Sequence, residues 1–590
     1  MQPVTTATDA KGPLAGGRPT AVRRQPFSPV VFILVAILLA MIVPPILYLV
    51  QTSFYTTTMM GMRGQFTYEY WTGLFADPLF GRNAWNTLVF ALGSAALAIV
   101  IGVSQAWIVE RTDTPGRQYV FLLPVISIGI PGVLYTVAWV LIFGTSGPVN
   151  AILMWMTGST QPVFNVYSMT GMILIEAINW APLAFLLISS VFRAADASFE
   201  EASMMSGANV PRTFLSITLK LAMPAVLALA LLITIRAFEA FEIPALVGMR
   251  GNVYVLTTEI YADIQTTIPP NYGKSATFSI GLLVIVGVLL HFYNRLSRHA
   301  ERYQTITGKG YRPRPLLLGR LRYLTAGLLV LFFFIIVVLP VGMLIWMSLM
   351  PYIHQVSWSG LDLLTLNNYR KVLGTVTFMG ALWNSLLLGI GTATLTSLFS
   401  LLCAWFVVRR YRGAWLIDQL ATVPLTVPSI VLGVALLQLY LQLPFPFYGT
   451  LASIVFASWI RYMPYGMRYS FAGILPIHTE LEQASAISGA SQFTTFVRIV
   501  VPLVAPALTT CWLFVFLLSV GSVSLPILLT GTDSRVVAQV LFELWADAGF
   551  SRQVQHLMFS RNASAGVLYP RHFLGVELTA HVISSISRAV

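Results

Sequence analysis

Two stretches of the sequence match each other 282 residues apart, and they decide the fold. Residues 201–208 read EASMMSGA, and residues 483–490 read QASAISGA. In both, small side chains on one helical turn let a neighbouring chain approach closely, and the glycine that follows ends or bends the helix because it accepts positive φ. A short helix, a glycine break and a second helix would form a rigid knob. Its presence in two copies indicates that a partner docks on both.

The composition around these stretches indicates a membrane protein. Of the 590 residues, 56% are hydrophobic and only 10% are charged, whereas a soluble domain carries roughly 25% charged residues. The bilayer is the solvent that suits such a chain. The net charge of +13 comes from Lys and Arg residues that lie mainly between apolar runs, which is a topology signal and not a nucleic-acid footprint. We therefore expect the lipid membrane, and no nucleic acid, as a partner.

Apolar runs long enough for a spanning helix, about 20 residues, follow one another along the chain. The first begins near residue 30. It is too long for a signal-peptide core and lacks a cleavage site, so we expect it to be a spanning helix. Before it, residues 1–28 are predicted to form a disordered basic tail. The eleven predicted spans are 30–50, 87–109, 119–143, 171–192, 221–247, 276–293, 324–350, 385–408, 416–442, 451–474 and 503–530.

Basic residues give the predicted orientation. Segment 295–322 carries eight Lys and Arg residues against one acid, and segment 409–412 carries three arginines. Segment 145–170 has neither Lys nor Arg. By the positive-inside rule, the N-terminus, the 295–322 linker and the loops after spans two, four, eight and ten are cytoplasmic. The predicted location is a bacterial inner membrane, which the chain crosses many times.

The two halves of the chain match outside these knobs as well. Residues 85–87 read WNT and residues 383–385 read WNS, 298 residues apart, while Pro182 matches Pro464 at a spacing of 282. Six spans per unit would place both halves in the same orientation, as a parallel repeat. The predicted fold class is an all-α polytopic membrane protein of two parallel six-helix repeats. Its predicted parts are the tail 1–28, the first unit 29–294, the basic cytoplasmic linker 295–322, the second unit 323–545 and an atypical tail 546–590.

The C-terminal tail departs from this repeat. A twelfth span should follow residue 549, but residues 551–590 contain scattered charges and histidines and no apolar run of membrane length. A frameshifted or truncated gene end would explain the missing last helix of the second repeat, and so would a genuine eleven-span variant. We favour the first explanation because the tail has no counterpart in the first half.

The repeated knob resembles the cytoplasmic signature of binding-protein-dependent ABC importer permeases, which is Glu-Ala-Ala, three residues, then Gly. The resemblance covers about residues 30–545, as two fused permease units. It implies docking of two cytoplasmic ATPase subunits, which would bind ATP and Mg, and delivery of substrate by a periplasmic binding protein. This chain would then be a transport subunit without enzymatic activity or a cofactor of its own. The implied coupling residues are Glu200, Glu201, Ala202, Ser203 and Gly207, with Glu482, Gln483, Ala484, Ser485 and Gly489 in the second copy.

The match has two departures. Gln483 stands where the family usually has Glu, and Lys220 stands where the second half has Pro502. Either the Gln weakens one ATPase contact, or one carboxylate is enough. The layout and the run 238–248, FEAFEIPALVG, look most like iron(III) uptake permeases. Similar chains move thiamine, polyamines or aminoethylphosphonate.

Ionisable residues inside the predicted spans indicate a polar pathway, because a charge at mid-membrane costs at least about 2.5–3.5 kcal/mol. Arg236 and Glu239 are three residues apart and are expected to pair. Arg461 aligns with Asn179 at a spacing of 282 and either faces the pathway or extends to the membrane interface. The predicted pathway residues are Glu176, Asn179, Glu239, Glu242, Arg461 and Ser522.

We find no motif for other chemistry. The string Gly273-Lys274-Ser275 lacks the earlier glycine of a phosphate-binding loop, where Ile268 stands instead. Cys403 and Cys511 lie in apolar runs, so neither a disulfide framework nor a metal site is expected. The rival interpretation is an ion-coupled secondary transporter of two parallel repeats. It would have no use for paired docking knobs.

Overall fold

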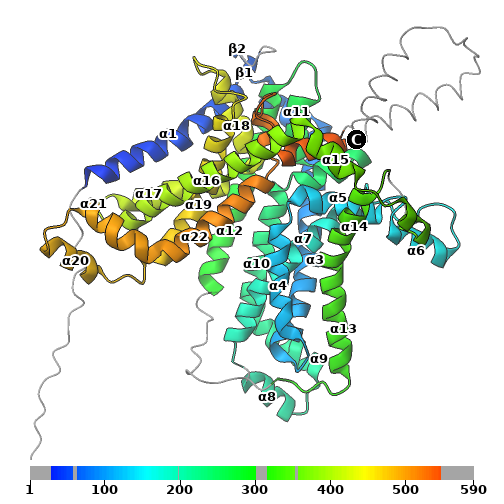
Figure 1. Cartoon of the computed structure of the whole chain (residues 1–590). Coiled ribbons are helices and arrows are strands. Elements are labelled where there is room, and N and C mark those ends of the chain that lie inside the picture. Colours follow the sequence, from blue (N-terminus) through cyan, green and yellow to red (C-terminus); the bar gives the residue numbers. More distant parts are fainter. Residues whose placement is uncertain (1–27, 58–62, 197, 301–314, 353–355, 547–590) are drawn as a thin grey trace, which may run out of the picture.

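The computed structural model describes residues 28–57, 63–196, 198–300, 315–352 and 356–546. The tail up to residue 27, residues 301–314 of the linker and residues 547–590 lie outside this range, so the predicted disordered tail and the missing twelfth span concern residues that are not described. Within the described range the chain is almost entirely helical (Figure 1). The prediction of an all-α polytopic fold is confirmed.

The first unit contains one small hairpin among its helices. Strands β1 (Tyr55–Thr57) and β2 (Arg63–Phe66) pair in antiparallel fashion. Its helices are α1 (Pro29–Thr52), α2 (Glu69–Ala76), α3 (Pro78–Arg111), α4 (Leu122–Gly129), α5 (Gly132–Phe143), α6 (Pro148–Thr157), α7 (Met169–Ala194), α8 (Ser198–Met205), α9 (Val210–Thr213), α10 (Leu219–Glu239), α11 (Leu256–Gln265) and α12 (Tyr272–Ala300).

The second unit repeats this order in part; among the described residues the hairpin, α6 and α12 have no counterpart in it. Its helices are α13 (Leu321–Phe333), α14 (Leu339–Leu349), α15 (Asn367–Gly374), α16 (Val376–Val408), α17 (Ala414–Thr422), α18 (Ser429–Leu441), α19 (Leu451–Ile474), α20 (Thr479–Ile487), α21 (Gln492–Thr495), α22 (Val501–Gly521) and α23 (Pro526–Leu529), followed by a helix at Val537–Ala546.

Helices occupy all eleven predicted spans, but not all are apolar spanning helices. Within the described residues nine are long and apolar enough to cross a membrane, and ten if one bent pair is a single span. The helix α19 is 24 residues long but is not among them; it carries Arg461 and Arg468. Arg461, near the middle of this helix, therefore needs another partner than lipid.

The third predicted span of each unit is broken at a proline. In the first unit α4 ends at Gly129 and α5 begins at Gly132, with Pro131 between them. In the second unit segments Ala414–Thr426 and Ser429–Leu441 meet at 105° next to Pro428. Proline lacks a backbone donor and disfavours the α conformation of the preceding residue. The prediction of continuous helices over 119–143 and 416–442 is wrong in this respect.

The fifth predicted span of each unit ends early, at the same repeat position. The helix α10 ends at Glu239 and α22 ends at Gly521, and the next residues, Ala240 and Ser522, have extended backbones. The predicted spans 221–247 and 503–530 are therefore too long. Irregular backbone at membrane depth is tolerated where protein buries it or where it lines a cavity.

The first spanning helix of each unit packs on the other unit. In Figure 1, α1 lies along the second unit and α13 along the first. The contacts agree: α1 packs against α17 and α18, while α14 packs against α5 and α13 against the turn that precedes α4. This reciprocal packing joins the units through their broken helices.

The repeated Trp-Asn-Thr/Ser motif anchors a short helix in each unit. Thr87 Oγ1 accepts a hydrogen bond from the Leu256 N–H at the start of α11, at 3.0 Å. In the second unit Ser385 Oγ accepts one from the Val537 N–H, at 2.9 Å. Asn86 donates to the carbonyl of Tyr254, and the matching asparagine of the second unit bonds backbone carbonyls just before residue 537. The motif therefore fixes the helix that follows each break.

Candidate coupling loops and translocation cavity

The two predicted knobs have the same internal structure. In the first, Ser203 Oγ lies 3.0 Å from Thr213 Oγ1, and Gly207 has a φ of +87°. In the second, Ser485 Oγ lies 2.8 Å from Thr495 Oγ1, and Gly489 has a φ of +84°. Positive φ favours glycine because a Cβ atom would strain the backbone. Each knob is thus a helix (α8 or α20), a glycine turn and a second short helix, as predicted.

An ion pair, buried in the first unit and partly buried in the second, braces each knob to the membrane domain. Arg111 Nε, at the end of α3, lies 3.0 Å from Glu200 Oε1, and a second nitrogen of Arg111 donates to the Ala195 carbonyl at 3.1 Å. In the second unit Arg409 Nη2 lies 2.7 Å from Glu482 Oε1 and also donates to the Ile477 carbonyl at 3.1 Å. Each arginine therefore joins three segments: the second span, the end of the fourth span and the knob helix.

Of the two adjacent positions at the start of each motif, only the first is part of the brace. Glu200 and Glu482 face inward onto their arginines. Glu201 is half-buried and Gln483 is exposed, and Ala202 and Ala484 are exposed as well. The carboxylate that precedes Gln483 is already in an ion pair and cannot replace the missing one without breaking that pair. From the sequence, Arg111 and Arg409 had been used only to predict which loops are cytoplasmic.

The tip of each knob exposes a large apolar side chain. Met205 is 89% exposed at the end of α8, and Ile487 is 88% exposed at the end of α20. Phe199 and Leu481, one and a half turns earlier, are about half exposed. These pairs also match at a spacing of 282. These four residues are not among the candidates predicted from the sequence. The position of Met205 and Ile487, two residues before the glycine of each motif, was a usable signal.

A cavity of about 610 Å³ lies where the units meet. Its walls come mainly from α7, α10, α19, α22 and the breaks after α4 and α10. Every predicted pathway residue lines it: Glu176, Asn179, Glu239, Glu242, Arg461 and Ser522. The structure thus brings together residues up to 346 positions apart in the chain. Their role in translocation stays a prediction.

Glu239 forms ion pairs with two arginines, one from each unit. Its Oε2 lies 3.1 Å from Arg236 Nη1 and 3.0 Å from Arg461 Nη2. Arg461 also donates to the carbonyls of Pro424 and Val427, which lie at the break between α17 and α18. The expected pairing of Arg236 with Glu239 is present. Arg461 faces the cavity and is only 7% exposed, so it does not extend to the membrane interface.

The other two acids of the cavity have different surroundings. Glu176 is buried and accepts a hydrogen bond from the Trp180 indole N–H at 2.8 Å. Glu242 lies just after the α10 break, where its carboxylate contacts Gly132 at the start of α5 and the backbone of Val523. A helix N-terminus favours a negative charge. Neither acid is in an ion pair in the described part of the chain.

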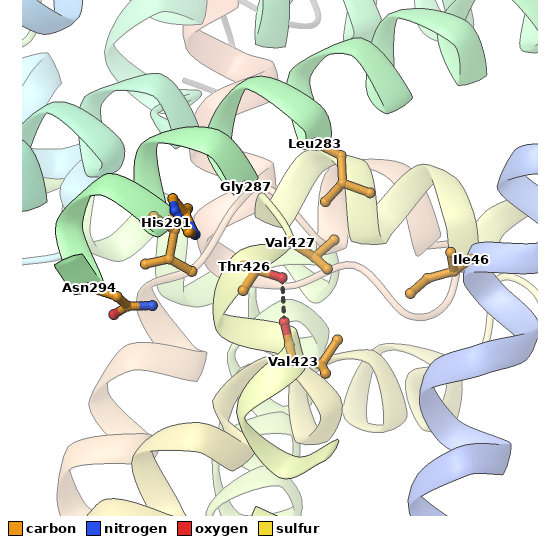
Figure 2. A pocket seen from close by; sticks show the side chains of 9 residues that line it. Ile46, Leu283, Gly287, His291, Asn294, Val423, Thr426 and Val427 are labelled. Carbon is orange, nitrogen blue, oxygen red and sulfur yellow. Dashed lines mark hydrogen bonds between the residues drawn. The ribbon is translucent and has the colours of Figure 1, made fainter. Parts of the chain in front are cut away.

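A second hollow of about 390 Å³ lies beside the break in the third span of the second unit (Figure 2). It is lined by Ile46 of α1, by Leu283, His291 and Asn294 of α12, and by Val423, Thr426 and Val427 at the break. Thr426 Oγ1 donates to the Val423 carbonyl within the turn, at 2.8 Å. This hollow contains no carboxylate, and it shares none of its lining residues with the cavity between the units.

Two repeated helical units, a matched knob on each and a polar cavity between them define a two-unit membrane permease. Residues 98–303 and 396–567 match the family described as binding-protein-dependent transport system inner membrane component. These ranges cover more than half of the chain, which therefore belongs to this family. It is a multi-pass transport component, and its relatives are permease subunits rather than enzymes.

Similar proteins include two permeases with related names. The chain is 28% identical over 467 residues to the ferric transport system permease protein FbpB of Actinobacillus pleuropneumoniae, covering 78% of this chain and 65% of that protein. It is also 28% identical over 448 residues to the putative ferric transport system permease protein FbpB 1 of Haemophilus influenzae, covering 75% and 68%. The chain thus spans about two thirds of their length. A chain from the structure of a bacterial ABC transporter that imports alginate is 20% identical, with a TM-score of 0.37, 45% of this chain covered and 96% of that chain.

Proposed function

We propose that this chain is the permease of an ATP-driven importer of iron(III), with two cytoplasmic ATPase subunits docked on its knobs and a periplasmic protein that delivers the substrate. The matched knobs carry the proposal. Each presents an exposed apolar tip, Met205 or Ile487, on a helix that an ion pair ties into the membrane domain. An exposed apolar side chain on a rigid support is suited to fill a pocket on a partner.

The relatives and the cavity support the proposed substrate class. Two similar proteins are named for ferric transport, and carboxylate oxygens in the cavity suit a hard cation. A similar protein of Escherichia coli, 24% identical over 43% of this chain, is named for spermidine and putrescine transport. A polyamine is therefore the alternative substrate.

The mechanism proposed is alternating access. ATP and Mg would bind to the partner subunits, and their closure would pull the two knobs together. Each knob would move its unit through the Arg111–Glu200 or Arg409–Glu482 brace. The units would then rock about the contact between Glu239 and Arg461, which lies between them. We also propose that the N-terminus and both knobs lie in the cytoplasm, in keeping with the basic loops.

The test is purification of the tagged chain with the ATPase subunit encoded beside it, using Gly207→Leu and Gly489→Leu together as the variant. Leucine would be strained at both positions because their φ is positive. Gly327→Leu is the matched control, since it has open space around it and no such φ. We expect wild type and the control to retain the ATPase and the double variant to lose it.

The ion-coupled alternative predicts a different result. A folded wild-type chain that retains no ATPase, and that accumulates substrate in vesicles when only an ion gradient is applied, would reject the importer proposal.

A further inference from the structure

We propose that Glu176 and Glu242, with the free carboxylate oxygen of Glu239, form a transient site for a hard, multiply charged metal cation, and that its carboxylates come only from the first unit. The inference deepens the proposed function, on which its transport role rests. It is carried by three observations: the units differ at these positions, both arginines of the cavity are already engaged, and one buried carboxylate oxygen has no partner.

The first observation is the asymmetry of the two-unit cavity. At the repeat spacing of 282, which aligns α10 with α22 from end to end, the counterparts of Glu176, Glu239 and Glu242 are Ser458, Gly521 and Ser524. Gly521 and Ser524 line the same cavity. The fold of the knobs, the braces and the Trp-Asn-Thr/Ser motif are matched between the units, whereas all three acids of the cavity are present in the first unit only.

The second observation is that the cationic side chains of the cavity are engaged. Arg236 bonds Glu239 and the Tyr465 hydroxyl, at 3.1 and 3.2 Å. Arg461 bonds Glu239 and two carbonyls of the broken helix. Both guanidinium groups therefore converge on Glu239, and neither Glu176 nor Glu242 has a cationic partner in the described part of the chain. A cavity with this balance attracts cations and repels anions.

The third observation concerns Glu239 itself. This side chain is 94% buried, and its Oε2 forms the ion pairs with both Arg236 and Arg461. Its Oε1 is buried and has no hydrogen-bond partner in the described part of the chain. A buried acceptor without a partner is costly, and here it belongs to a residue in the wall of the cavity. A cation that enters the cavity could supply the missing interaction.

The same geometry predicts loose binding. The described residues contain no group of three His, Cys, Asp or Glu side chains arranged to hold a metal ion. A passing cation would therefore keep part of its water shell and exchange other ligands for carboxylate and serine oxygens, including Ser522 on the second unit. Carboxylate, hydroxyl and water oxygens suit hard cations. Weak binding is also required of a pathway, because a tightly held ion would not leave.

The binding test uses Tb³⁺, a hard trivalent cation whose emission is excited by energy transfer from a nearby indole. The Trp180 indole lies 2.8 Å from Glu176, so the whole purified chain reports its own site. We expect Glu176→Gln and Glu242→Gln each to weaken Tb³⁺ binding about tenfold or more. The matched controls, Ser458→Ala and Ser524→Ala at the counterpart positions, should change it less than about twofold.

Several results would overturn the proposal. Unchanged Tb³⁺ titrations in both glutamine variants would do so, and so would equal weakening by the serine controls. If a glutamine variant does not fold, Glu176→Asp and Glu242→Asp decide, since they keep the charge and should retain binding. We expect Ga³⁺ to displace Tb³⁺ and spermidine at the same concentration to leave it bound; displacement by spermidine would reject a metal site.

Transport separates this inference from the proposed function. In vesicles containing the chain, its ATPase subunit and its binding protein, the glutamine variants should lose iron(III) uptake while the ATPase stays bound. If wild type binds Tb³⁺ at Glu176 but retains no ATPase, the site stands and the importer proposal fails. If wild type imports iron(III) and the glutamine variants import it equally well, the importer stands and the site fails.

Discussion

Arg461 in α19 and Glu239 in α10 are 222 residues apart in the chain, and their side chains meet at 3.0 Å in the cavity between the units. The contact also joins two helix breaks, because Glu239 is the last residue of α10 and Arg461 holds the carbonyls that precede α18. Arg461 thus binds backbone carbonyls at the helix break of its own unit and forms an ion pair with a carboxylate of the other unit.

Removing this arginine should destabilise the whole chain. Arg461→Ala leaves Glu239 with one cation and uncaps two buried carbonyls, and breaking a buried ion pair costs about 3–5 kcal/mol. We expect a clear fall in the melting temperature of the purified chain. Arg468→Ala is the control, because Arg468 lies two turns further along α19 and is exposed; it should change stability by less than about 0.5 kcal/mol. Equal melting temperatures for the two variants would contradict the role given to Arg461.

The knob braces should transmit motion rather than bind the ATPase. With Arg111→Ala and Arg409→Ala combined, we expect the ATPase subunit to hydrolyse ATP in the complex while uptake in vesicles is lost. The physical reason is that each knob would no longer be tied to the second and fourth spans of its unit.

Arg193 provides the control for the braces. It pairs with Glu110 nearby but is 64% exposed on its side chain, and exposed pairs contribute about 0–1 kcal/mol. Arg193→Ala should therefore leave hydrolysis and uptake coupled. Retained coupling in the double brace variant would show that the braces are only structural.

The apolar knob tips should contribute directly to docking. Met205→Ser or Ile487→Ser removes a side chain that is nearly fully exposed in the free chain. If it becomes buried in the complex, the loss is about 1.5–3 kcal/mol, or roughly ten- to a hundredfold in Kd. Binding of the isolated ATPase subunit to the purified chain measures this. Trp358→Ser, at a similarly exposed side chain outside the knobs, should not weaken docking.

A buried acid outside the spanning helices should make stability depend on pH. Burial raises the pKa of Asp263 in α11 from 3.8 to about 7, with Glu259 and Asp77 adding to the rise and Lys274 opposing it. The folded chain therefore holds a proton that the unfolded chain releases at lower pH. Stability from this group is greatest below about pH 4 and falls as the pH rises towards 7.

Thermal unfolding of the purified chain at pH 5 and pH 8 measures this effect. Asp263→Asn should reduce the difference between the two melting temperatures. The same difference in wild type and variant would assign the pH dependence to other groups.

The sequence by itself predicted the helical spans, the two-unit repeat, the knobs and the residues of the cavity. These features depend on local properties: an apolar run must enter lipid, a glycine after a helical turn ends it, and a charged residue in a spanning helix must find a polar partner. Arg461 entered the prediction as a charge inside a predicted span and Asn179 through the repeat spacing, and both line the cavity.

Only the tertiary structure decided which of these residues are engaged and where the helices break. Hydropathy is averaged over a window that includes Pro131 or Pro428, and it carries no information on the direction of a helix axis. It therefore did not predict the bends in the third spans. The pairing of Arg111 with Glu200 joins positions 89 residues apart, and a topology rule sees only the charge of the arginine. Whether Arg461 faces the pathway or extends to the membrane interface depends on how the two units meet, and the sequence of a single span does not contain the distance between Arg461 and Glu239.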